Sequence, residues 1–189
     1  MREIDWQERK IVIELVKNAR ISDNEISRRT RIPLKTVNRK RKKLEEEGLL
    51  YYFTHIDNSS SGTGLFRSRK LYIVKLKKGM LRQKILEAML ETKDNNIFIK
   101  NIFESYIGEV DGHNAVFFVI ESHREHDIVE IYNSEIIPEI ERLLGDCIES
   151  TQVIGITTPI RMMHNYLPLA NMEKGTIKEE FSNDKIFVG

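Results

Sequence analysis

The stretch RRTRIPLKTVNRKRKK, residues 28–43, decides the fold of this chain. It carries nine Lys or Arg side chains in sixteen positions, and no carboxylate interrupts them. Ile32 and Val37 within it, and Leu44 just after it, can anchor a helix, and Pro33 suits a first helical turn. The run therefore predicts a packed helix that presents cations to an anionic partner, with a solvated face as the alternative.

Two helices are predicted ahead of this stretch. Residues 4–18 place apolar side chains at helical spacing, and Asp5 with Glu8 makes a capping box at the start. A second capping box at Ser22–Glu25 begins a short helix that ends near Thr30.

The third helix is predicted from Pro33 to Gly48, because glycine commonly ends a helix. Three helices, with a tight turn before the third, predict a helix-turn-helix. The β-rich run at 49–56 and the turn-rich loop at 57–64 predict a strand and a loop that form a wing or a linker.

The chain then alternates between strand-like and helix-like patterns as far as residue 158. Asp111-Gly112 marks a hairpin turn, and Pro138 predicts a kink or break in the last helix. The order β-α-β-β-α-β predicts an α+β fold: a winged helix-turn-helix, then a ferredoxin-like domain with one helical layer on a four-stranded antiparallel sheet. The predicted strands are 71–78, 97–110, 113–122 and 150–158, and the predicted helices are 80–91 and 127–144.

Charge is distributed unevenly along the 189 residues, whose 40% hydrophobic content suffices for real cores. Residues 1–70 carry 17 Lys or Arg against 10 Asp or Glu, and residues 71–189 carry 13 against 19. A basic first part joined to an acidic remainder predicts separate modules, the first with an anionic partner. The predicted segments are a helix-turn-helix domain at 1–56, a linker or wing at 57–70, a ferredoxin-like domain at 71–158 and a C-terminal extension at 159–189.

The cellular location is expected to be the cytoplasm. No apolar run reaches the roughly 18 residues of a membrane span, and the N-terminal sequence MREIDWQERK lacks the apolar core of a signal peptide. The single cysteine, Cys147, cannot form an internal disulfide, which fits a reducing compartment.

Several motifs in the first domain share a known order and spacing. Residues 18–22 are NARIS and residues 32–50 are IPLKTVNRKRKKLEEEGLL, followed by Ile56-Asp57 and by glycines at 62 and 64. The arrangement resembles the Lrp/AsnC family of transcription regulators, also called leucine-responsive or feast/famine regulators. The family pattern is roughly Asn-Gly/Ala-Arg-x-Ser, then Leu-Ser-x-x-Thr-Val-x-x-Arg-Ile-x-x-Leu-Glu-x-x-Gly-Val-Ile, and later Ile-Asp and Leu-Gly.

The chain departs from the family pattern at four places. Pro33 replaces the serine cap of the third helix, and Lys40 replaces the usual arginine. Arg41 stands where the family has a buried isoleucine, and we expect its stem to pack while its head reaches water. The family's Gly-x-Tyr-Asp at the hairpin appears here as Asp111-Gly112-His113-Asn114.

The resemblance covers about residues 1–158 and is most specific in the first 64. It implies a sequence-specific transcription regulator that binds double-stranded DNA as a homodimer or a higher even oligomer. It also implies that the second domain dimerises through its sheet and binds a small-molecule effector between subunits. The residues implied for that effector are Asp111, Gly112, His113 and Asn114. We expect no catalytic residues, no cofactor and no metal site.

The third helix presents two faces with different chemistry. Val37 and Leu44 are seven residues apart and share the inward face, so Lys35, Asn38 and Arg39 point outward, where a recognition helix meets base edges. Asparagine suits adenine and arginine suits guanine in the major groove, and the remaining cations suit phosphates. The predicted DNA-binding residues are Arg28, Arg29, Arg31, Lys35, Thr36, Asn38, Arg39, Lys42 and Lys43.

Two other functions remain open. Some tetrapyrrole decarboxylases of haem biosynthesis have a similar two-domain layout with His residues near the hairpin, as His113 is here. Such an enzyme has no use for nine cations on a recognition helix. The second alternative is an effector-sensing or assembly partner that no longer binds DNA.

Three further features have a structural interpretation and an alternative. His123 and His126 beside Asp127 have the spacing of a metal site, but a loop before a helix is the simpler interpretation. Cys147 is expected to be a small buried apolar residue rather than a nucleophile. The aromatic residues expected in the core or at a dimer interface are Trp6, Phe117 and Phe118.

Overall fold

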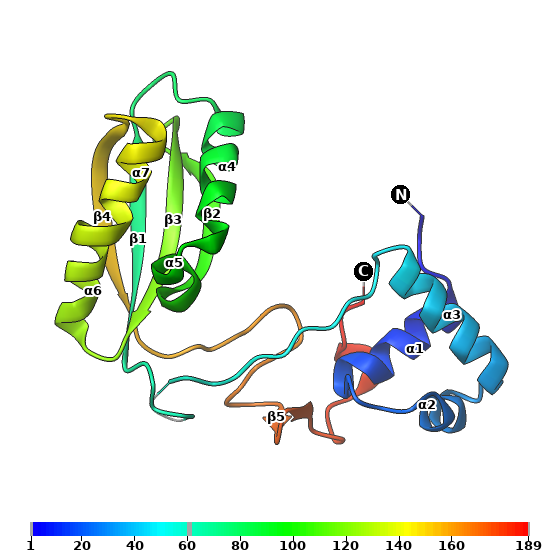
Figure 1. Cartoon of the computed structure of the whole chain (residues 1–189). Coiled ribbons are helices and arrows are strands. Elements are labelled where there is room, and N and C mark those ends of the chain that lie inside the picture. The colour runs from blue at the N-terminus through cyan, green and yellow to red at the C-terminus, as the bar shows by residue number, and fades with distance from the viewer. Residues whose placement is uncertain (1, 60–61, 189) are drawn as a thin grey trace. The chain divides into compact units, whose positions relative to one another are not determined.

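A computed structural model of the chain describes residues 2–59 and 62–188 (Figure 1). The chain divides into two compact units. One joins the residues up to Thr54 with those from Thr158 onward, and the other spans His55–Thr157. The C-terminal segment is therefore part of the unit that holds the basic helices.

The first unit contains the predicted helix-turn-helix. Its helices are α1 (Trp6–Lys17), α2 (Asp23–Thr30) and α3 (Leu34–Glu46). They pack around a small apolar core of Ile11, Leu15, Ile21, Ile26, Ile32 and Val37.

The ends of these helices follow the predicted caps, with one exception. Asp5 caps α1 in a full capping box with Glu8. The Ser22 hydroxyl accepts the Glu25 N–H at 3.2 Å, but the second capping box is incomplete because the Glu25 carboxylate binds two arginines instead. Gly48, with φ of 65°, lies in the left-handed region just after α3, as expected for a helix stop.

The strand predicted at 49–56 is wrong. The segment forms neither helix nor strand, and Tyr51, Phe53 and Ile56 are exposed. A strand needs a neighbour for its backbone N–H and C=O groups, and no strand pairs with this segment in the part of the chain that the structure describes. The local sequence is rich in strand-forming residues, but propensity alone does not supply a pairing partner.

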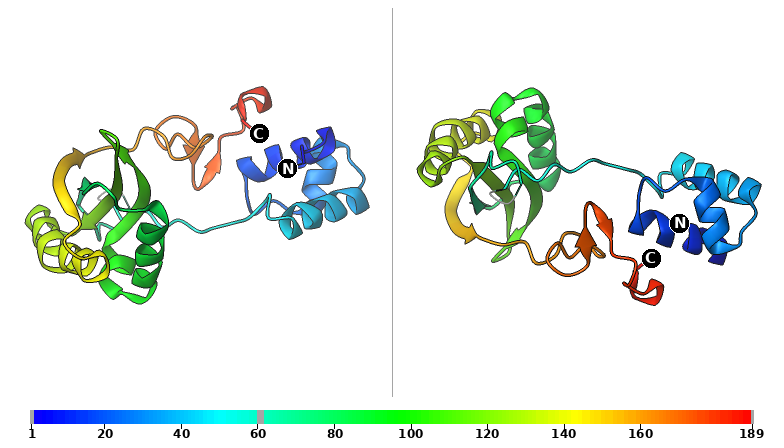
Figure 2. Two further views of the ribbon diagram at one scale, coloured as in Figure 1. Left: turned by 90° about the horizontal axis from the view of Figure 1, so that it is seen from above. Right: turned by 90° about the horizontal axis from the view of Figure 1, so that it is seen from below.

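The second unit, which begins at His55, contains the predicted ferredoxin-like fold. Its four antiparallel strands lie in the order β2-β3-β1-β4. The helices cover one face of the sheet (Figures 1 and 2). The strands are β1 (Ser68–Leu76), β2 (Ile102–Val110), β3 (His113–Ser122) and β4 (Ile148–Ile156). The helices are α4 (Arg82–Glu91), α5 (Asn96–Asn101), α6 (Glu125–Ile131) and α7 (Ile137–Leu144), with a 3₁₀ turn at Thr92–Asp94.

The strand predicted at 97–110 is only partly correct, because its first residues form α5. The Asn95 side chain caps this helix by accepting the N–H groups of Ile97 (3.0 Å) and Phe98 (3.4 Å). The short apolar run Ile97–Ile99 fits either a helix or a strand by pattern, so the cap decides between them. β2 begins only at Ile102.

A kink or break was predicted at Pro138, and the helix is indeed irregular, but the irregular turn lies just before the proline and the helical run is not interrupted. A π-helical segment, Tyr132–Ile136, separates α6 from α7, and Pro138 lies in the first turn of α7. Ile136 and Ile140 remain fully buried against the sheet, so the irregular turn keeps both helices in the core.

The sheet has a second face that the helices of this unit do not cover. Strand alternation places Phe118 in the helix-covered core and Phe117 on the other face.

Trp6, expected in a core or an interface, is 63% exposed on α1, so the core assignment is wrong for this residue. No helix among the described residues is long and apolar enough to cross a bilayer.

Candidate nucleic-acid interface

The third helix has the two faces that its spacing predicts. Val37 and Leu44 are buried, whereas Lys35, Asn38 and Arg39 are exposed on the opposite side. Pro33 takes the N-cap position without a side-chain hydrogen bond. The first turn of α3 therefore presents its side chains to solvent from a packed scaffold.

The exposed cations differ in whether a carboxylate already holds them. Arg31, Lys35 and Arg39 have no ion pair within residues 2–59 and 62–188. At the end of α3, Lys42 lies 3.5 Å from Glu46 and Lys43 lies 3.7 Å from Glu47. Such exposed pairs are weak and give way readily to another anion. All five side chains are therefore available to a phosphate or a base.

Two arginines of the turn are held by carboxylates. Arg28 and Arg29 both bind Glu25, and Arg28 remains 73% exposed. Arg29 also lies 3.5 Å from Glu14 and 3.2 Å from Glu179. Of the predicted phosphate contacts, Arg29 is thus the one most engaged by the protein itself.

The Glu25 carboxylate, which binds both Arg28 and Arg29, should make the stability of the helical unit depend on pH. Hydrogen bonds from Arg28 and then Arg29 lower its pKa from 4.5 to about 2. A carboxyl whose folded pKa is depressed stabilises the fold above its unfolded pKa, and this contribution disappears as the pH falls through the folded value. We therefore expect the stability difference between the wild type and Glu25→Gln to be constant above about pH 5 and to vanish towards about pH 2.

The measurement is urea unfolding at several pH values, followed by the fluorescence of Trp6, the single tryptophan, which lies in the helical unit. A stability difference that does not change between pH 5 and pH 2 would mean that the Glu25 carboxylate makes no such bonds in solution.

Arg41 lies in a polar clamp, not with its head in open water as the sequence predicts. Its guanidinium donates to Asp23 at 2.9 Å, to Glu45 at 3.2 Å and to the Tyr52 hydroxyl at 3.0 Å. Asp23 in turn accepts a hydrogen bond from the Asn38 amide. The departure from the family at Arg41 is thus linked, through one carboxylate, to a side chain of the outward face.

Lys40 is a buried neighbour of this face whose contacts were not predicted from the sequence. It is buried and pairs with Asp5, and its ammonium lies 3.8 Å from Glu8, which is 2% exposed. Arg2 completes the cluster, at 2.8 Å from Glu8. Burial alone would raise the pKa of Glu8, but the hydrogen bonds from Arg2 and from the Asp5 N–H hold it below its usual value.

A signal for this cluster is present in the sequence. Residue 40 falls between Val37 and Leu44 on the inward stripe of the helix, and a lysine on such a stripe needs an anionic partner. The cluster ties the start of α1 to the middle of α3 and so fixes the orientation of the exposed face.

The predicted effector residues are engaged within their own domain. The His113 Nδ1 lies 2.8 Å from Glu149 and 3.0 Å from the Leu76 carbonyl. The Asn114 amide donates to the Met80 carbonyl at 2.7 Å. Asp111 and Gly112 form the hairpin turn with positive φ values of 50° and 73°. These contacts join the hairpin to the neighbouring ends of β1 and β4.

Cys147, His123 and His126 lie in the second unit, apart from the basic face, and have other surroundings. Cys147 is buried, and burial raises the pKa of its thiol, which favours the unreactive protonated form. His126 pairs with Asp127 at 2.9 Å, and His123 contacts the Leu65 carbonyl at 3.3 Å. No group of three or more His, Cys, Asp or Glu able to hold a metal occurs in the described residues.

Comparison with known proteins finds a similar family for the first domain. Residues 5–51 match the family described as winged helix-turn-helix DNA-binding. No curated protein matches the chain significantly.

Solved structures match nearly the whole fold. E. coli AsnC is 19% identical with a TM-score of 0.60, and the match covers 85% of this chain and 97% of AsnC. B. subtilis LrpC is 17% identical with a TM-score of 0.60, covering 85% and 99%. The transcriptional regulator NMB0573 from Neisseria meningitidis, solved with L-Met, is 15% identical with a TM-score of 0.63, covering 85% and 94%.

Each match covers nearly all of the neighbouring structure. About a seventh of this chain has no counterpart in these neighbours. Residues 5–51 are therefore similar to a winged helix-turn-helix DNA-binding family, and the chain has the fold of the AsnC and LrpC structures.

Proposed function

We propose that this chain is a transcription regulator of the Lrp/AsnC type that recognises specific sites on double-stranded DNA. The observation that carries the proposal is the outward face of α3. Lys35 and Arg39 stand there exposed and without a carboxylate partner among the described residues, inside a domain that matches a DNA-binding family. The structural neighbour NMB0573 is a transcriptional regulator, which favours this function over the decarboxylase alternative.

Base recognition is assigned to the first turns of α3. Arg39 can bind the O6 and N7 acceptors of guanine with its two-pronged guanidinium. Asn38 gives one amide hydrogen to Asp23 and keeps its other hydrogen and its oxygen for adenine. Asp23, held by Arg41, thereby orients Asn38. Lys35 lies on the same outward face.

Phosphate contacts are assigned to the turn, at Arg28, Arg29 and Arg31, and to the end of α3, at Lys42 and Lys43, with Thr36 as a hydroxyl donor near the start of the helix. We expect Lys42→Ala and Lys43→Ala each to weaken binding to all sequences alike and to reduce the slope of log K against log salt by about 1. The measurement is fluorescence anisotropy on a specific and a random duplex over a range of salt concentrations. An unchanged slope would remove these lysines from the phosphate contacts.

The test of the function is a gel shift of the full-length protein on the DNA upstream of its own coding sequence. We expect a retarded complex that unlabelled copies of the same DNA displace at lower concentration than unrelated DNA of equal length. Equal displacement by both competitors would contradict sequence-specific recognition.

The second unit supplies the proposed assembly and sensing functions. We propose a homodimer, or a higher even oligomer, formed through the sheet face that carries Phe117. The L-Met bound to the meningococcal neighbour supports the proposal that this chain binds a small-molecule effector. The candidate effector-binding residues in this chain are Asp111, Gly112, His113 and Asn114. We further propose a cytoplasmic location, where both DNA and metabolites are accessible.

A further inference from the structure

The C-terminal segment, residues 159–188, has a structure of its own. It contains a two-stranded hairpin, β5 (Met172–Glu173) and β6 (Thr176–Ile177), and a short 3₁₀ turn at Asn183–Lys185. The buried Asn171 holds the hairpin to the preceding loop by donating to the Asn165 carbonyl at 2.9 Å. Asn165 in turn binds the backbone of Phe187 through both atoms of its amide, at 2.8 and 2.9 Å.

This segment is anchored to α1 by an apolar cluster. Ile177, Ile186 and Val188 are buried, and they share the cluster with Val12 and Val16 of α1. Polar contacts flank the cluster, since Arg9 donates to the Val188 carbonyl at 2.7 Å and the Tyr166 hydroxyl donates to the Val16 carbonyl at 3.2 Å. In Figure 2 the red C-terminal segment lies on one side of α1 and the cyan α3 on the other.

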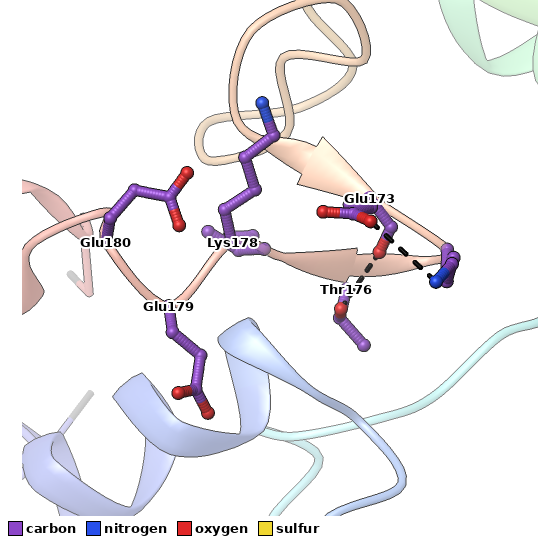
Figure 3. A pocket seen from close by; sticks show the side chains of 7 residues that line it. Glu173, Thr176, Lys178, Glu179 and Glu180 are labelled. Carbon is purple, nitrogen blue, oxygen red and sulfur yellow. Dashed lines mark hydrogen bonds and ion pairs between the residues drawn. The ribbon is translucent and has the colours of Figure 1, made fainter.

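The anchor places one carboxylate beside the DNA-binding turn. Glu179 follows the buried Ile177 by two residues, and its oxygen lies 3.2 Å from the Arg29 guanidinium. Figure 3 shows Glu179 pointing towards the blue helical ribbon, while Glu180 points the opposite way. Glu180 makes no ion pair within the described residues.

We propose that the C-terminal segment restrains DNA binding by holding the Arg29 guanidinium with Glu179. The inference rests on the proposed function, in which Arg29 is a phosphate ligand. A DNA phosphate and the Glu179 carboxylate then compete for the same guanidinium, and the carboxylate also repels the approaching backbone.

The restraint is graded rather than absolute. Glu179 is 85% exposed and Arg29 is 36% exposed, so their pair is a weak surface interaction that DNA can displace. The guanidinium keeps its bonds to Glu25 and to Glu14 when Glu179 leaves, so it stays in position for a phosphate. When the C-terminal segment is released, the Arg29 guanidinium therefore becomes available to a phosphate without moving.

The test compares Glu179→Gln with Glu180→Gln in the full-length protein, on the same duplex. Both variants lose one negative charge at neighbouring positions, so any general electrostatic effect is shared. We expect Glu179→Gln to bind about two- to five-fold more tightly than the wild type, and Glu180→Gln to change affinity less than about 1.5-fold. The salt slope should steepen by up to about 1 for Glu179→Gln alone.

A second comparison repeats the pair of substitutions in an Arg29→Gln background. There the advantage of Glu179→Gln over Glu180→Gln should disappear, because the guanidinium for which the carboxylate competes is gone. Equal effects of the two glutamine variants in the wild-type background, or an advantage that persists without Arg29, would overturn the inference and leave the proposed function intact. If the wild type binds no DNA at all, the proposed function falls first and the inference falls with it.

Discussion

Replacing Arg39 with alanine is expected to weaken specific DNA binding by about 1–3 kcal/mol and to relax the preference at one base position. Arg39 is exposed on the outward face of α3 and has no ion pair within the residues that the structure describes, so its loss leaves the fold untouched. The measurement is competition of the variant and the wild type between a specific duplex and a set of duplexes with single base changes.

The control for this prediction is Arg82→Ala, an exposed arginine of α4 in the other unit. It removes the same charge and should leave the ratio of specific to non-specific affinity unchanged. If Arg39→Ala lowers both affinities equally, so that the ratio stays the same, Arg39 contacts phosphate and the base-contact assignment is wrong.

Replacing Glu8 with alanine is expected to destabilise the helical unit by about 3 kcal/mol. The substitution leaves the buried Lys40 with Asp5 as its remaining partner and removes the acceptor of the Asp5 N–H. Breaking a buried ion cluster costs this much because the remaining charge stays away from water without full compensation. The measurement is urea unfolding followed by Trp6 fluorescence, which reports on this unit.

Glu3→Ala is the matched control, because Glu3 carries the same charge on the same segment but is exposed. Its stability should lie within about 0.5 kcal/mol of the wild type. If Glu8→Ala and Glu3→Ala unfold at the same urea concentration, the buried cluster contributes nothing to stability, and another contact must orient α3.

Local patterns in the sequence predicted most of the architecture. The Asp5–Glu8 capping box, the inward positions of Val37 and Leu44, and the Asp111-Gly112 turn each depend on residues within one or two turns of chain. Such patterns depend only on nearby residues, so packing against distant parts of the chain does not change the structure that they predict. The β-α-β-β-α-β order followed from them, and the sheet order agrees with it.

The errors arose where a decision depends on distant residues. The run at 49–56 has strand propensity but no pairing partner among the described residues, and residues 97–101 turned helical because Asn95 caps them. In the sequence, Lys40 and Arg41 look like two further members of a basic run. In the structure, Lys40 is buried and pairs with Asp5, and Arg41 pairs with Asp23.

The role of the C-terminal segment was beyond the reach of sequence patterns for the same reason. Ile177 and Ile186 stand in a weakly patterned stretch, and their partners on α1 lie more than 150 residues earlier in the chain. The candidate DNA-binding face could be predicted because one helix carries it. The contact proposed to restrain it could not, because Glu179 lies 150 residues after Arg29 in the chain.

Sequence-specific recognition by α3 is tested most directly by a hydroxyl-radical footprint of the full-length protein on the DNA upstream of its coding sequence. A dimer that inserts one α3 into each half-site should protect two windows whose centres lie about one helical turn of DNA, or a multiple of it, apart. We expect these two windows for the wild type and their loss, at the same protein concentration, for Arg39→Ala. Uniform protection along the fragment, or windows that Arg39→Ala leaves unchanged, would contradict it.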